Sequence, residues 1–109
     1  MSAFNDREKG YESKFAHDEE LRFKANARRA KLVGLWAAGL MGKSGDEADA
    51  YAKSVVIADF EEAGDEDVFR KLRKDLDAAG VEVSDHQIRR EMDDLLVTAR
   101  EQIMMEVKG

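Results

Sequence analysis

The sequence has no cysteine and no proline among its 109 residues. Without cysteine the chain can form no disulfide, no thiol nucleophile and no thiolate metal site. Without proline nothing forces a break inside a long helix. The chain also lacks the run of about 18–20 apolar residues that a membrane span requires, and its charged start does not resemble a secretion signal. We therefore expect a cytoplasmic protein with no direct membrane contact.

Positive charge is outweighed by negative charge but is concentrated in one stretch. The net charge of −6 disfavours general attraction to nucleic acid. Residues 21–43 nevertheless hold six bases and no acid, whereas residues 44–67 hold nine acids and one base. We expect these bases to form a solvated face that pairs with the acidic stretch. The alternative is a nucleic-acid-binding adaptor that would use the basic side chains Arg22, Lys24, Arg28, Arg29 and Lys31.

Three glycines divide the chain after residue 20. Gly42, Gly64 and Gly80 each follow a helical apolar pattern, at the place where a left-handed residue ends a helix. The segments that follow begin with capping signals. Ser44 with Glu47, and Ser84 with Gln87, have the spacing of a capping box, and Asp65 can cap the third segment.

Apolar residues recur every three or four positions between these breaks, so each segment predicts a helix with one apolar face. The members of these faces are Leu32, Val33, Leu35, Trp36, Leu40, Met41, Ala48, Tyr51, Ala52, Val55, Val56, Phe60, Val68, Phe69, Leu72, Leu76, Ala79, Ile88, Met92, Leu95, Leu96, Ala99, Ile103 and Val107. Short loops between such helices favour antiparallel neighbours. We predict an all-α fold in which residues 21–109 form a four-helix bundle.

Residues 1–20 form a separate segment by the same criteria. Phe4, Tyr11 and Phe15 lie on one helical stripe, but few apolar residues surround them and Gly10 weakens the helix by about 1 kcal/mol. Burying three aromatics gains about 2 kcal/mol each, while ordering the backbone costs roughly 1–2 kcal/mol per residue. We predict a flexible segment that becomes helical against a partner. A frayed terminus without function is the alternative.

The residues from Ala37 to Ser44 fit a relaxed phosphate-binding loop. In such a loop Lys43 would contact the phosphate charge and Ser44 the magnesium ion. Such a loop needs a strand before it and a parallel sheet behind it, and neither is predicted. A helix end at Gly42 and a helix start at Ser44 explain the same letters. A small nucleotide-binding protein remains an alternative, since weak nucleotide binding at this helix start is compatible with the sequence.

The sequence gives little support for a metal site or a catalytic site. The acidic run from Asp59 resembles part of a calcium loop, but Ala63 and Arg70 stand where ligands belong. His17 and His86 have no serine or cysteine setting that indicates a triad. We predict no enzyme activity, no metal and no cofactor.

Four stretches closely resemble the zeta inhibitor subunit of alphaproteobacterial F-type ATP synthases. They are KFAHDEE at 14–20, LVGLWAAGL at 32–40, AYAKSVV at 50–56 and VSDHQIRR at 83–90. The similarity extends over essentially the whole chain. It implies a helical domain that docks on the catalytic head, formed by the alpha, beta and gamma subunits, and hence a location peripheral to the inner membrane. It also implies an N-terminal segment that enters a catalytic interface near the rotor and inhibits ATP hydrolysis.

The resemblance places the inhibitory residues in the N-terminal segment. By position they are Phe4, Asp6, Arg7, Glu8, Tyr11, Glu12, Lys14 and Phe15. In such a helix the aromatic side chains would anchor the segment, and the charges would set its register and orientation.

Overall fold

The computed structural model describes residues 18–61 and 66–108, and within these ranges it contains four helices and no strand. The helices are α2 (Glu19–Leu40), α3 (Gly45–Asp59), α4 (Glu66–Ala78) and α5 (Asp85–Lys108). The predicted all-α class with four helices is confirmed. None of the described helices is long and apolar enough to cross a membrane.

Helices α2 and α4 end as their glycines predict. Gly42 and Gly80 have φ angles of 78° and 74°, in the left-handed region. In each case the next residue reaches back to the helix: Lys43 N–H donates to the Ala38 carbonyl and Val81 N–H to the Leu76 carbonyl, both at 2.9 Å. These bonds complete Schellman motifs and satisfy the last carbonyls of each helix. Gly64 lies outside the described residues.

The helix starts follow the prediction only in part. Ser84 forms the predicted capping box, because its N–H donates to Gln87 Oε1 at 2.9 Å and its Oγ accepts from Gln87 N–H at 3.1 Å. Ser44 occupies the N-cap position of α3, but its side chain makes no capping hydrogen bond, so the second predicted box is wrong. We attribute this to Gly45, whose φ of 55° distorts the first turn. Asp65 lies outside the described residues.

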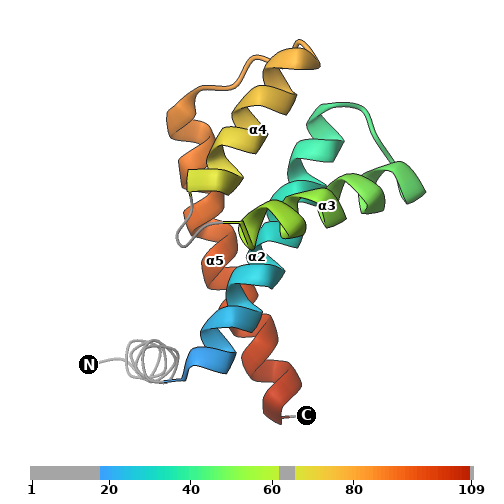
Figure 1. The fold of residues 1–109 in the computed structure, drawn as a ribbon. Helices are drawn as coiled ribbons and strands as arrows, with labels where there is room; N and C mark the ends of the chain where they lie inside the picture. The colour runs from blue at the N-terminus through green and yellow to red at the C-terminus, as the bar shows by residue number, and fades with distance from the viewer. Residues whose placement is uncertain (1–17, 62–65, 109) are drawn as a thin grey trace, which may run out of the picture.

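Helix α2 is the centre of the fold. It packs against all three other helices, whereas α3 and α5, as far as they are described, have no Cα atoms within 8 Å of each other. In Figure 1, α3 runs across α2, while α4 and α5 run side by side in opposite directions. The arrangement is therefore an irregular four-helix bundle around one helix.

The main core uses residues that the apolar pattern selects. Val33 of α2, Val55 of α3, Leu72 of α4 and Ile88 of α5 are among its fully buried members, and Trp36 packs against them. The pattern also selected Phe60, Leu40, Ala79 and Val107, which are exposed. Each of these four lies in the last turn of its helix or just beyond it, where fewer neighbours are available to cover a side chain.

Close packing of α2 and α3 depends on Gly34. A Cβ atom at this position would lie 2.7 Å from the Ala52 Cα and 3.2 Å from Val55 Cγ2. The backbones of α2 and α3 therefore approach each other more closely here than a side chain at position 34 would allow. Gly34 is a packing residue, which the sequence pattern alone did not indicate.

A second, smaller core lies at the other end of α2. Leu21 and Ala25 of α2 pack there with Ile103 and Met104 of α5. Arg28 ties the same two helices together, because its guanidinium donates to Gln102 Oε1 at 2.8 Å and to Glu106 Oε1 at 2.6 Å. Asp18, the first described residue, lies at this end of the domain.

Candidate interaction site

The residues that the sequence selects for inhibition are not in the described part of the chain. Phe4, Asp6, Arg7, Glu8, Tyr11, Glu12, Lys14 and Phe15 all precede residue 18. They remain predictions. The described residues instead show how α2 begins and which surfaces the domain presents.

The start of α2 is capped by Asp18. Asp18 adopts an extended conformation, and its Oδ1 accepts a hydrogen bond from Leu21 N–H at 3.1 Å. Glu19 and Glu20 place negative charge in the first turn, where the helix dipole favours it. The helix thus begins two residues earlier than predicted and has its own cap.

The basic side chains that the structure describes do not share one solvated face. Arg22 and Lys24 pair within α2 with Glu19 and Glu20, at 4.0 and 3.3 Å, and Arg28 pairs with α5. Arg29 is only 1% exposed. Its position four residues from Ala25 and Val33, both buried, explains this: all three lie on the inner face of the helix.

Two aromatic rings form an exposed stack next to the start of α2. Phe23 of α2 and Phe60 at the end of α3 have ring centroids 5.2 Å apart and an interplanar angle of 13°. Ile57 lies one turn before Phe60 on α3. All three side chains are more than half exposed, at 58% for Phe23 and Ile57 and 53% for Phe60. The three residues are named the aromatic patch; the sequence pattern placed Phe60 in the core and therefore missed it.

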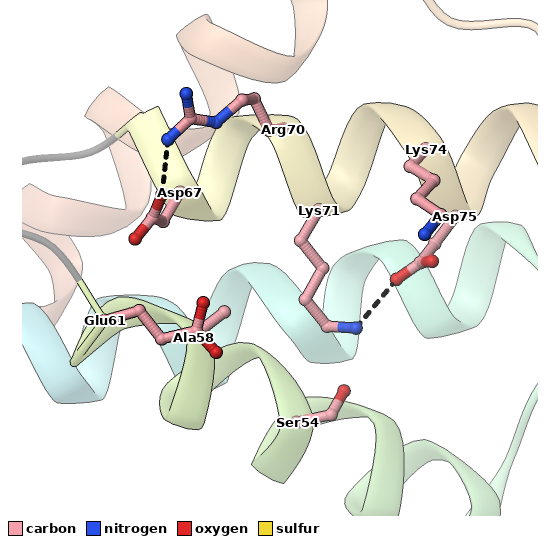
Figure 2. A pocket seen from close by; sticks show the side chains of 8 residues that line it. All are labelled: Ser54, Ala58, Glu61, Asp67, Arg70, Lys71, Lys74 and Asp75. Atoms are coloured by element: carbon pink, nitrogen blue, oxygen red, sulfur yellow. Dashed lines mark hydrogen bonds and ion pairs between the residues drawn. The ribbon is translucent and has the colours of Figure 1, made fainter.

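An open cavity of about 330 Å³ lies between α3 and α4 (Figure 2). Three basic side chains (Arg70, Lys71, Lys74) and three acidic ones (Glu61, Asp67, Asp75) line it. Several of these charges are already paired: Lys71 Nζ lies 3.0 Å from Asp75 Oδ2, and Arg70 pairs with Asp67. The charges balance, so the cavity does not select strongly for a ligand of either sign.

A polar network beside this cavity joins α3 to α4. The Tyr51 hydroxyl donates to Asp75 Oδ2 at 2.8 Å, and Lys71 lies over the Tyr51 ring. Burial raises the pKa of Tyr51, and the hydrogen bond and negative charge of Asp75 raise it further. The tyrosine is therefore a neutral donor at physiological pH, with a structural role.

The remaining motifs also have structural explanations. Gly42 and Ser44, the end of the apparent phosphate loop, terminate α2 and begin α3. His86 lies exposed in the first turn of α5, and His17 lies outside the described residues. Among the residues with described positions, no three acidic or histidine side chains are grouped to hold a metal ion.

Comparison with known proteins identifies the family. The sequence model of the ATPase inhibitor subunit zeta family matches residues 1–102. The chain belongs to this family. A protein solved by solution NMR has a similar fold to this zeta-family chain, with a TM-score of 0.70 and 52% sequence identity, over 79% of this chain and 98% of that one. None of the curated proteins searched matches the chain.

Proposed function

We propose that the protein inhibits ATP hydrolysis by the F-type ATP synthase, as a non-catalytic regulatory subunit. Its partner is the catalytic head, formed by the alpha, beta and gamma subunits. The segment that precedes Asp18 enters a catalytic interface near the rotor as a helix, and the four-helix bundle docks outside. The observation that carries the proposal is the match to the ATPase inhibitor subunit zeta family over residues 1–102, which includes the N-terminal segment.

Two further observations support this division of roles. The aromatic residues Phe4, Tyr11 and Phe15 lie on one helical stripe, which suits insertion of a helix into an apolar groove. The bundle, in turn, caps α2 through its own Asp18 and buries its own core. The segment can therefore be given to a partner without unfolding the domain.

The proposed mechanism is steric. Each hydrolytic step requires a catalytic interface to open and close, and a helix held inside it would oppose that movement. The aromatic side chains would supply most of the binding energy. Charged residues of the segment would fix its orientation in the interface, as charge pairs do in other complexes.

The test is an ATP turnover assay with ATP synthase from the same source. The full-length chain should reduce turnover, and a chain lacking residues 1–15 should not, although its circular dichroism and unfolding transition remain those of a folded helical domain. A truncated chain that inhibits as strongly as the full-length one would reject the role of the segment. A full-length chain in excess that leaves turnover unchanged would reject inhibition itself.

A further inference from the structure

We infer that Met104 is a redox-sensitive residue, whose oxidation to a sulfoxide opens the end of the domain where α2 and α5 pack on each other. The oxidant is a peroxide, and the product is polar where the reduced side chain is apolar. The part that opens consists of residues 21–28 and 102–106 and is named the α2–α5 end. This change lies within the domain, beyond the proposed function and independent of it.

Methionine supplies all the sulfur of this chain, which has five methionines and no cysteine. Three of the methionines lie in α5, in different surroundings. Met92 in the main core and Met104 in the smaller core are 2% and 3% exposed, whereas Met105 is 68% exposed. Consecutive residues of a helix point about 100° apart, so Met104 faces inward while Met105 faces solvent. Met105 therefore meets a dissolved peroxide freely, and Met104 meets it only when the α2–α5 end opens.

The smaller core has less cover than the main core. Its side chains come from two helices, Leu21 and Ala25 of α2 with Ile103 and Met104 of α5, whereas the main core draws on all four. Of the four helices, only α2 and α5 reach this end of the domain (Figure 1). Local opening of such an end requires less free energy than unfolding of the whole domain. It therefore exposes Met104 more often than Met92, although both side chains are buried.

A charged contact holds the α2–α5 end closed. Arg28 of α2 donates to Gln102 Oε1 at 2.8 Å and to Glu106 Oε1 at 2.6 Å. These two acceptors lie on either side of Met104 along α5, so both contacts must break when α5 moves away from α2. The Arg28 side chain is 28% exposed, which shields its contacts from water in part. The strength of this contact therefore sets how often the Met104 sulfur is exposed.

Oxidation of Met104 is a two-electron step. The thioether sulfur attacks one oxygen of hydrogen peroxide, the S–O bond forms as the O–O bond breaks, and the other oxygen takes up the proton and leaves as water. The sulfoxide oxygen accepts hydrogen bonds, and burying it among Leu21, Ala25 and Ile103 without a donor is unfavourable. The oxidised end therefore stays open more of the time. A methionine sulfoxide reductase reverses the step, in which two thiols of the reductant become a disulfide and the oxygen leaves as water.

The first test measures the oxidation rate of each methionine by peptide mass spectrometry of the full-length chain in hydrogen peroxide. Met105 should react fastest, Met104 about tenfold more slowly and Met92 about tenfold more slowly again. Arg28→Ala should raise the Met104 rate about fivefold, since it removes the contact that closes the end, and should leave the Met105 rate unchanged. The control Arg22→Ala, which removes an exposed ion pair at 4.0 Å, should change neither rate by more than about twofold.

Two outcomes of this experiment would overturn the inference. Equal rates at Met104 and Met92 would mean that the α2–α5 end does not open separately from the main core. A Met104 rate that Arg28→Ala leaves unchanged would mean that this contact does not control the exposure of the sulfur.

The second test asks whether the Met104 sulfoxide opens the end. Met104→Leu and Met105→Leu are a matched pair, because leucine keeps an apolar side chain of similar size without an oxidisable sulfur. Peroxide should speed hydrogen exchange at the amides of Ala25 and Ile103 about tenfold in the unsubstituted chain and in Met105→Leu, but not in Met104→Leu. Exchange at the Leu72 amide, in the main core, should stay unchanged in all three chains.

The reductase, supplied with a thiol, should restore slow exchange in the unsubstituted chain. Circular dichroism before oxidation checks that both leucine variants fold, and the rates in the unsubstituted chain test the inference without them. Peroxide that speeds exchange equally in both variants, or in Met104→Leu alone, would show that another methionine is responsible.

Discussion

The two halves of α2 are stabilised in different ways. Its C-terminal half contributes Val33 and Ala37 to the main core and lies close enough to α3 that only glycine fits at position 34. Its N-terminal half packs with the end of α5 through Leu21 and Ala25 and through the charged contacts of Arg28, and it exposes Phe23. The difference separates a closely packed half from a half that leaves a large aromatic side chain exposed.

The largest expected effect on stability comes from removing one large side chain from the main core. Leu72→Ala removes a fully buried side chain of α4, and it should reduce the free energy of unfolding by about 2–5 kcal/mol. Leu21→Ala in the smaller core should cost less, because a site near a helix end can collapse more readily around the lost volume. Chemical denaturation of both variants measures the difference. Equal losses would contradict the expectation that the smaller core relaxes more readily.

The next effect tests the close approach of α2 and α3. Gly34→Ala should destabilise the fold by about 1–3 kcal/mol, because the added Cβ would meet the Ala52 backbone at 2.7 Å. Gly39→Ala is the matched control, since it lies on the same helix with nothing within 4 Å of the added Cβ. That variant should be more stable by about 0.5–1 kcal/mol, as alanine is in helices. Thermal unfolding of the pair would contradict the packing argument if both shifts had the same sign.

The smallest effect concerns the polar contacts of the N-terminal half. Arg28→Ala should lower the free energy of unfolding by about 1 kcal/mol, because two hydrogen bonds between α2 and α5 are lost at a partly exposed site. Arg22→Ala removes only an exposed pair at 4.0 Å and should cost between about 0 and 0.5 kcal/mol. Hydrogen exchange should show faster opening of the two helix ends for Arg28→Ala alone. Similar exchange in the two variants would mean that Arg28 does not hold the ends together.

Local sequence signals predicted the parts of the fold that depend on a few neighbouring residues. Gly42 and Gly80 end helices because glycine adopts a left-handed φ without strain, and Ser84 with Gln87 closes a reciprocal cap within four residues. The box at Ser44 failed for an equally local reason, the left-handed Gly45. The cap at Asp18 was missed because residue 20 was taken as the end of the separate N-terminal segment.

Contacts between distant residues could not be predicted in this way. The apolar pattern placed Phe60 in the core, but whether its side chain is covered depends on which helix lies over the end of α3, and there it meets Phe23 instead. Arg29 was expected in solvent and is buried, because the three helices around α2 leave it on the inner face. For the inhibitory segment, the eight candidates from Phe4 to Phe15 precede the described residues and stay predictions.

The sequence by itself determined the helical class, two helix ends and one complete cap, because these depend on backbone preferences and hydrogen bonds between near neighbours. Its resemblance to the zeta inhibitor subunit also pointed to the family that the comparison identifies. Only the tertiary structure decided that α2 lies at the centre, that Gly34 sets the distance to α3, and that Phe23 and Phe60 meet at the surface. These features depend on how helices cross in space, which the spacing of residues along one helix does not encode.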